Sequence, residues 1–155
     1  MTPAETIQAI LDDMGRAVMT DDWPLFRAHH TMPFTLRTGT TTLVVEEEVD
    51  MRFAFDQFRD MLRGLRVTDY LRLVETARLI ETGLIQGDYM THLVSGSHRI
   101  VPPFRSTMTL GATADRWLVT RIDTEVLNAR WPIGIPLPPP DMGAAPGRPR
   151  PPEES

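Results

Sequence analysis

The sequence contains no cysteine, and this absence excludes disulfide bonds, thiolate nucleophiles and zinc sites built from thiolates. It also contains no lysine, because all 16 basic residues are arginine, so a side-chain Schiff base and attached pyridoxal phosphate are excluded. No apolar run is long enough to cross a membrane. Acidic residues interrupt the N-terminal segment where a signal peptide would need an apolar core. We therefore expect a cytoplasmic protein with no membrane partner.

The composition favours one globular domain. A chain of 155 residues with 41% hydrophobic and 24% charged residues is typical of a protein with a single sizeable core. The net charge of −5 and the scattered arginines argue against a nucleic-acid partner. The sequence has no phosphate-binding loop, dinucleotide fingerprint or HExxH motif. His92 and His98 lie about 20 Å apart in an extended strand, so we expect no cofactor and no metal site.

Three helices are predicted in the first half of the chain. Thr2, Pro3 and Glu5 form a capping-box start for the first helix, which has apolar residues at helical spacing up to Val18. Asp21 or Asp22 is a suitable cap for a short second helix. The third helix has an apolar stripe of period 3.6 that runs from Met51 to Leu65 and includes Phe55 and Phe58.

Alternating residues predict the strands. A short pair, 33–37 and 41–46, precedes the third helix, and two longer hairpins follow it at 69–81 with 84–94 and at 104–112 with 117–126. Nine prolines then fall between residues 132 and 152, where a central strand cannot form. We therefore divide the chain into a domain over residues 1–128 and a Pro-rich tail over 129–155, partly docked at first and then disordered.

The order of these elements resembles the nuclear transport factor 2-like superfamily, also called SnoaL-like or cystatin-like. The resemblance covers roughly residues 2–125 and rests on the amphipathic first helix, the DDW segment at 21–23, PFTLRT at 33–38 and DRWLVTRID at 115–123. It implies an α+β fold in which a curved antiparallel or mixed sheet wraps around a long helix to form a cone with a pocket. It also implies a small-molecule ligand and frequent pairing of two subunits.

The register of the first long hairpin predicts a site. A two-residue loop at Thr82–Gly83 would place Glu81 opposite Leu84, Ala77 opposite Asp88, Glu75 opposite Met90 and Leu73 opposite His92. One sheet face would then combine aliphatic residues with Glu75, Asp88 and His92, which is typical of a pocket lining. Burial would raise the pKa of Glu75, so these three residues are the candidate acid–base groups. A bulge at Gly87 would re-aim the side chains.

The second hairpin supplies candidate ligand contacts. Its register places Leu110 opposite Val119, Met108 opposite Arg121, and Ser106 opposite Asp123. If this face continues the same lining, the residues that contact substrate are Arg121, Asp123, Met108, Phe55, Phe58 and Trp117. The opposite face of the first long hairpin would carry Arg72, Thr76, Arg78, Tyr89, Thr91 and Leu93. We expect a homodimer to form through that face.

Two functions remain open at this point. The first is a cofactor-free lyase, isomerase or hydrolase that uses carboxylate–histidine chemistry, with Arg121 stabilising charge. The second is a non-catalytic dimeric module for ligand binding or protein interaction, in which Glu75 and His92 only neutralise neighbouring charges. The fold does not choose between them.

Overall fold

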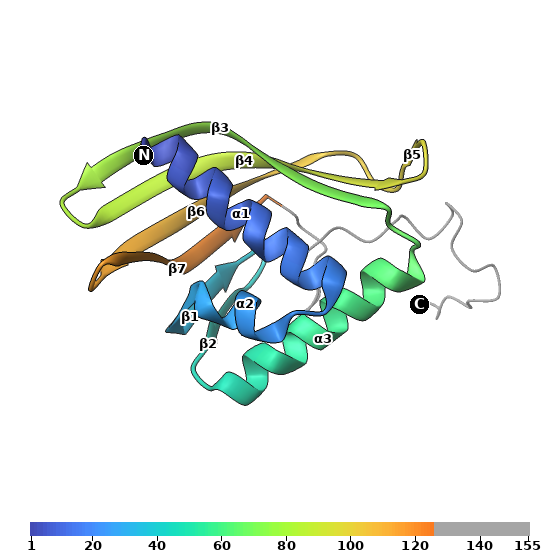
Figure 1. Ribbon diagram of the computed structural model, residues 1–155, viewed down its shortest axis with the longest axis horizontal. Coiled ribbons are helices and arrows are strands. Elements are labelled where there is room, and N and C mark those ends of the chain that lie inside the picture. The colour runs from blue at the N-terminus through green and yellow to red at the C-terminus, as the bar shows by residue number, and fades with distance from the viewer. Residues whose placement is uncertain (126–155) are drawn as a thin grey trace.

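The computed structural model describes residues 1–125, which form three helices and a seven-stranded sheet. The predicted tail at 129–155 and the end of the last predicted strand lie outside the described residues. Figure 1 shows the elements in chain order, which are α1 (Pro3–Thr20), α2 (Trp23–Ala28), β1 (His30–Arg37), β2 (Thr42–Val45), α3 (Glu48–Gly64), β3 (Asp69–Glu81), β4 (Leu84–Ser95), β5 (His98–Arg99), β6 (Phe104–Thr113) and β7 (Arg116–Thr124).

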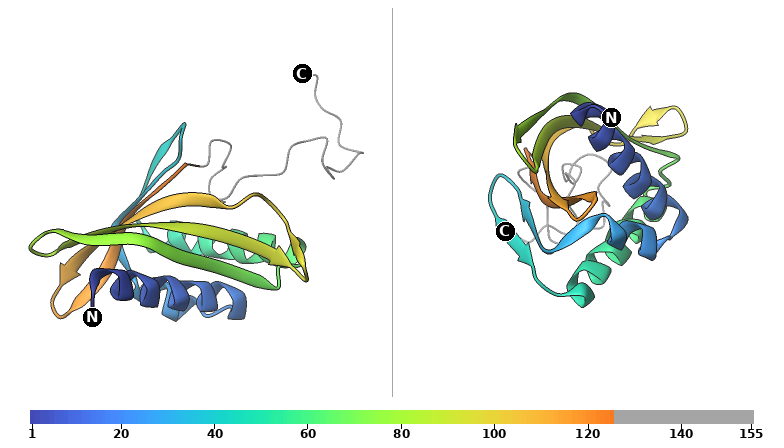
Figure 2. Two further views of the ribbon diagram at one scale, coloured as in Figure 1. Left: turned by 90° about the horizontal axis from the view of Figure 1, so that it is seen from above. Right: turned by 60° about the vertical axis from the view of Figure 1, so that its left-hand side comes forward.

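The sheet is mixed and curved. Its strands lie in the order β2-β1-β7-β6-β4-β3, with β5 paired to β4. Only β1 and β7 run parallel to each other among the described strand pairs, and all other pairs are antiparallel. The helices lie on one side of the sheet, and the sheet bends around them (Figures 1 and 2). The predicted α+β cone is therefore confirmed.

Helix α1 is specified by its cap and its apolar stripe. The Thr2 side chain accepts a hydrogen bond from the Glu5 amide at 3.1 Å, and the Glu5 carboxylate accepts one from the Thr2 amide at 2.9 Å. Residues at helical spacing are buried against the sheet, from Ile7 to Val18. At Gly87 of β4 an added Cβ would lie 2.5 Å from Ile7 Cδ1, so glycine allows α1 to approach the sheet closely.

Helices α2 and α3 pack together beside α1. Asp22 caps α2, because its side chain accepts a hydrogen bond from the Leu25 amide at 3.2 Å. In α3 the buried residues are Met51, Phe55 and Leu62, which belong to the predicted apolar stripe. Aromatic rings join the two helices, since the ring centroids of Phe26 and Phe55 lie 5.0 Å apart.

The register of the first long hairpin differs from the prediction beyond its turn. The two-residue turn and the Glu81–Leu84 pair are confirmed, and Gly83 adopts the positive φ of 83° that such a turn requires. The register then shifts at two places in β3, at Ile80 and at Glu75, so that Leu73 pairs with Met90 and Leu71 with His92. Each extra residue in β3 moves the pairing by one position.

The register of the second hairpin also shifts once. The predicted pairs Leu110–Val119 and Ala112–Trp117 are confirmed, but Thr120 is an extra residue, so Met108 pairs with Ile122 and Ser106 with Thr124. Because side chains alternate along a strand, this single shift moves Arg121 and Asp123 to the opposite face from Met108.

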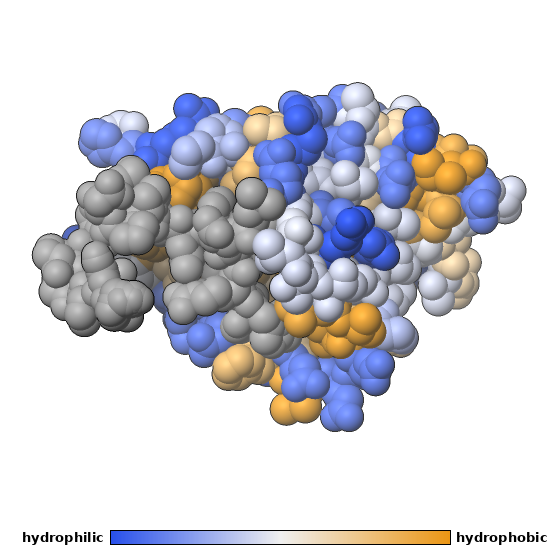
Figure 3. All heavy atoms as spheres, turned by 180° about the vertical axis from the view of Figure 1, so that it is seen from behind, coloured by the Kyte–Doolittle hydropathy of each residue, from blue (hydrophilic) through white to orange (hydrophobic). Residues whose placement is uncertain are grey.

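The predicted inner and outer faces are exchanged along the part of the first long hairpin that packs under the helices, whereas Met108 and Leu110 of the second hairpin are buried on the inner face as predicted. Arg72, Tyr89, Thr91 and Leu93 are buried under the helices, whereas Leu71 and Leu73 of the predicted lining are 47% and 51% exposed. The prediction took the aliphatic side of β3 as the inner side, but α1 packs on the other side. Figure 3, which shows the molecule from behind, displays a surface of mainly hydrophilic and intermediate residues with separate apolar groups.

Candidate ligand cavity inside the cone

A cavity of about 140 Å³ lies between the inner sheet face and the helices. Most of the described residues that line it are apolar: Met14, Val18, Phe26, Phe34, Leu36, Val45, Met51, Ala54, Phe55, Phe58, Phe104 and Ile122. The polar lining comes from one histidine, one arginine, two tyrosines and three hydroxyl residues: His30, Arg72, Tyr70, Tyr89, Thr91, Ser106 and Thr124. A largely apolar cavity with a few convergent polar groups is the usual form of a small-molecule site.

Arg72 is the only charged residue in the described lining, provided that His30 is neutral. Its side chain projects inward from β3 and is only 8% exposed. The Nη2 group donates a hydrogen bond of 2.9 Å to the carbonyl of Leu11 in α1, and the guanidinium lies 4.6 Å from the centre of the Tyr70 ring. The Nε atom is buried and has no hydrogen-bond partner among the described residues.

His30 begins β1 and lies in the cavity wall. It is 3% exposed, and burial lowers its pKa to about 4 even though the hydrogen bond to Phe26 opposes this change. Nδ1 must donate to the Phe26 carbonyl at 2.8 Å, since a carbonyl only accepts. The neutral ring therefore keeps Nε2 as an acceptor.

Tyr89 of β4 completes the polar group. It is 3% exposed, and burial raises its pKa to about 12, although the nearby Arg72 charge and hydrogen bonds with Ser106 and Arg72 oppose this change. The phenol is therefore protonated at neutral pH. Burial also raises the pKa of Tyr70. Arg72, Tyr89 and Ser106 thus form a buried cluster of donors on the inner face.

Comparisons with known protein sequences assign no family. No family model matches the chain. Among curated proteins, the transcription antitermination protein NusB of Mesorhizobium japonicum is 31% identical over 67 residues. This match spans 43% of the chain and 43% of that protein's length, so it carries no conclusion about the whole chain.

Comparisons with solved structures concern the fold. An NTF2-like protein of unknown function from Shewanella oneidensis matches with a TM-score of 0.58 and 11% identity, over 80% of this chain and 99% of that one. A domain of unknown function with a cystatin-like fold from Nostoc punctiforme matches with a TM-score of 0.59 and 14% identity, over 81% and 78%. The chain has the NTF2-like, cystatin-like fold.

The name of a third structural match describes an enzyme activity. A Novosphingobium aromaticivorans protein, named as a proposed aromatic ring hydroxylase, has a TM-score of 0.57 and 14% identity, over 88% of this chain and 92% of that one. At this identity the likeness shows the shared fold and not a shared activity.

Of four residues that were predicted to contact substrate, two line the cavity and two do not. Phe55 and Phe58 of α3 line the cavity. Met108 is fully buried in the core, and Trp117 packs partly buried against that core, but neither lines the cavity. The role of all four in substrate binding stays a prediction.

The three predicted acid–base residues do not line the cavity, and each has its own partner. Glu75 is exposed at a register shift, and its carboxylate accepts hydrogen bonds of 3.0 and 2.7 Å from Arg105. Asp88 accepts a hydrogen bond of 2.6 Å from Thr107, and His92 lies 3.3 Å from an Arg99 nitrogen. The burial that would favour acid–base chemistry at Glu75 is therefore absent, and the predicted catalytic roles are untested.

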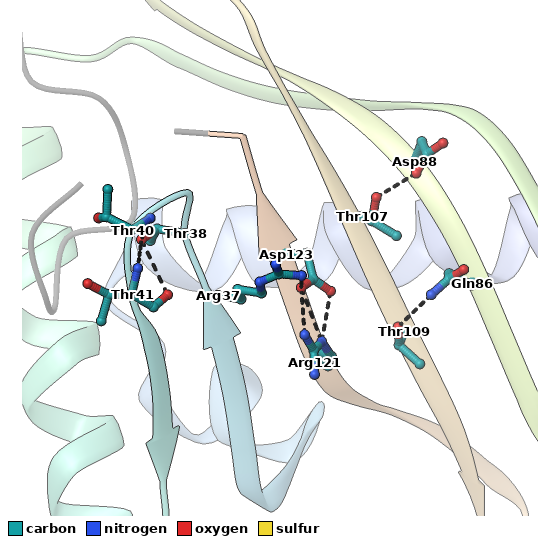
Figure 4. A network of polar contacts seen from close by, with 10 residues as sticks. All are labelled: Arg37, Thr38, Thr40, Thr41, Gln86, Asp88, Thr107, Thr109, Arg121 and Asp123. Atoms are coloured by element: carbon teal, nitrogen blue, oxygen red, sulfur yellow. Dashed lines mark hydrogen bonds and ion pairs between the residues drawn. The ribbon is translucent and has the colours of Figure 1, made fainter. Parts of the chain in front are cut away.

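Arg121 and Asp123 lie on the outer sheet face (Figure 4). The Arg121 guanidinium donates to both carboxylate oxygens of Asp123 at 2.9 to 3.1 Å, and Arg37 lies 3.9 Å from the same carboxylate. The shift at Thr120 explains this placement, because it reverses which residues of β7 point inward. Their predicted contact with substrate stays a prediction that the geometry of the cavity does not support.

The sequence interpretation missed His30, Arg72 and Tyr89 as lining residues. Arg72 and Tyr89 were assigned to the opposite face, and no ligand role was assigned to His30. The alternation along β3 does place Tyr70, Arg72 and Val74 on one face of the strand. Which of the two faces is the inner one depends on where α1 packs.

The structure identifies no candidate metal centre within residues 1–125, where no group of three or more metal-ligating side chains occurs. Within the same residues, no helix has the length and apolar character that a membrane span needs.

Proposed function

We propose that the protein binds a small, largely apolar molecule inside the cone. The observation that supports this proposal most strongly is the cavity of about 140 Å³, whose lining is mainly apolar and whose polar residues include His30, Arg72 and Tyr89. A cavity of comparable size, about 150 Å³, holds benzene in an engineered protein core. The ligand, or the part of it inside the cone, is therefore about the size of one six-membered ring with one polar substituent.

Binding is the function that the lining favours over carboxylate–histidine catalysis. The described lining includes a histidine, His30, but no aspartate or glutamate. A histidine with a pKa near 4 is a weak base at neutral pH, so it is better suited to accept a hydrogen bond than to remove a proton. The predicted lyase, isomerase or hydrolase activity stays a prediction with Glu75, Asp88 and His92 as its candidate residues.

Methionine methyl groups provide a direct test of binding. Met14 and Met51 line the cavity, whereas Met19 is 37% exposed on α1 and Met90 points to the outer face. In protein labelled with 13C at the methionine methyls, benzyl alcohol should shift the signals of Met14 and Met51 and leave Met19 and Met90 unchanged. Unchanged signals at Met14 and Met51 with saturating benzyl alcohol would refute the proposal.

A blocking variant provides the matched control. Ala54 lines the cavity from α3, and Ala54→Phe should fill space and weaken the binding of benzyl alcohol at least about tenfold. Val49→Phe on the same helix adds a ring at a position that is 68% exposed, so binding should be retained. Equal binding by the two variants would place the ligand elsewhere.

The predicted homodimer stays a prediction with a corrected surface. The face that was expected to pair two subunits, which includes Arg72 and Tyr89, is buried under the helices. Any pairing of sheets would therefore use the outer face, which carries Leu71, Leu73 and the polar contacts of Figure 4. Light scattering at micromolar concentration should give twice the chain mass if this pairing occurs.

A further inference from the structure

Within residues 1–125, the buried positive charge at Arg72 has no negative partner. None of the described ion pairs includes Arg72, and no carboxylate belongs to the described cavity lining. The guanidinium is held by the backbone carbonyl of Leu11, by the face of the Tyr70 ring and by a hydrogen bond with the Tyr89 hydroxyl. None of these groups carries a net charge at neutral pH, so the charge of the described lining is +1 while His30 is neutral.

An isolated charge in an apolar cavity is unfavourable unless an opposite charge or several hydrogen bonds offset the lost hydration. A guanidinium has five N–H donors in a planar fork that matches the two oxygens of a carboxylate. Arg72 belongs to the cavity lining, and its Nε donor is buried and lacks an acceptor among the described residues. A bound anion would provide the missing acceptor and the missing charge together.

This inference rests on the proposed function and names the class of ligand. We propose that the cone binds a small carboxylate whose anionic group pairs with Arg72 through Nε and whose apolar body lies against Phe55 and Phe58. The Tyr89 hydroxyl, protonated and close to the guanidinium, is a further donor to the same anion. The acceptor Nε2 of His30 suits a ligand hydroxyl on the other side.

A purely structural role for Arg72 is the competing explanation. The hydrogen bond of Nη2 to Leu11 ties β3 to α1, and that contact alone would explain an arginine that holds two elements together. It leaves the orphaned Nε and the absence of a carboxylate without explanation. The two roles differ in one respect, because only ligand binding makes the protein distinguish a carboxylate from a neutral molecule of the same shape.

Isothermal titration calorimetry with benzoate and benzyl alcohol separates these outcomes. For the full wild-type chain we expect benzoate to bind at least about tenfold more tightly than benzyl alcohol, as a charged hydrogen bond would provide. Equal affinity for the two probes would overturn the carboxylate proposal and leave the proposed function standing. Failure of both probes to bind would overturn the proposed function and this inference with it.

Two variants test whether Arg72 produces the preference for benzoate over benzyl alcohol. Arg72→Met keeps much of the side-chain length without the charge, and it should bring the ratio of benzoate affinity to benzyl alcohol affinity down to about one. Arg78→Met, on the exposed side of the same strand, should keep the preference. An undiminished preference in Arg72→Met would overturn the proposal.

A measurement on the wild type keeps the test valid if Arg72→Met does not fold. The 15N–1H signal of the Arg72 Nε group should shift when benzoate is added and should not shift with benzyl alcohol. A signal that ignores benzoate at saturation would show that Arg72 only joins α1 to the sheet, and would overturn the proposal.

Discussion

The buried neutral state of His30 makes stability depend on pH in a way that can be calculated. The pKa of His30 is about 4 in the folded chain, against 6.5 for an ordinary histidine. The unfolded chain therefore binds a proton at His30 as the pH falls through 6.5, while the folded chain remains unprotonated until about pH 4. Since the unfolded state binds more protons in this window, the free energy of unfolding decreases as the pH falls.

The size of this effect follows from the two pKa values. Between pH 7 and pH 5, His30 alone should lower the free energy of unfolding by about 2 kcal/mol, and the full loss below pH 4 should be about 3 kcal/mol. Carboxylates also titrate at acidic pH, so the His30 contribution has to be isolated by comparison with a variant that cannot titrate there. His30→Gln keeps a hydrogen-bonding side chain and removes the titration.

Urea unfolding at pH 7 and pH 5 measures the contribution. The wild type should lose about 2 kcal/mol more than His30→Gln between the two pH values, whatever the absolute stability of the variant. His98→Gln is the matched control, because His98 is exposed and its replacement should leave the wild-type loss unchanged. If the wild type and His30→Gln lose the same free energy, His30 is not buried in a neutral form and the description of the cavity is wrong.

Two further predictions concern the sheet. Gly87→Ala should lower the free energy of unfolding by about 1 to 3 kcal/mol, because its Cβ would lie 2.5 Å from Ile7 Cδ1. The control Gly64→Ala adds a Cβ in open space and should be neutral or slightly stabilising. Equal urea midpoints for the two variants would contradict this prediction. Glu75→Gln should leave stability and benzoate affinity nearly unchanged, because Glu75 forms an exposed pair with Arg105, and a tenfold loss of benzoate affinity by calorimetry would return Glu75 to the site.

The helices were predictable because their signals are local. The capping box at Thr2 and Glu5, the cap at Asp22 and the stripe of α3 each lie within a few residues of the structure that they specify. The two-residue turn at Gly83 is local for the same reason. Element order was then enough to indicate the cone.

The candidate site was not predictable in the same way, because it depends on register and docking. The extra residues at Glu75, Ile80 and Thr120 are ordinary residue types that do not mark a bulge. The single shift at Thr120 reverses the inward assignments beyond it, whereas the two shifts in β3 together leave Leu71 and Leu73 on the same face as Met90 and His92. The inner face of β3 is set by where α1 packs, and this choice buries a charged residue, Arg72, while it exposes Leu71. Simple hydrophobicity favours the opposite choice.

A crystal structure of the wild-type chain soaked with 4-bromobenzoate would show directly whether the cone holds a small carboxylate against Arg72, because the anomalous signal of bromine locates the ring. The bromine should lie in the cavity, with the carboxylate within about 3 Å of Arg72 Nε. A cavity without bromine, or a carboxylate that points away from Arg72, would contradict this mode of binding.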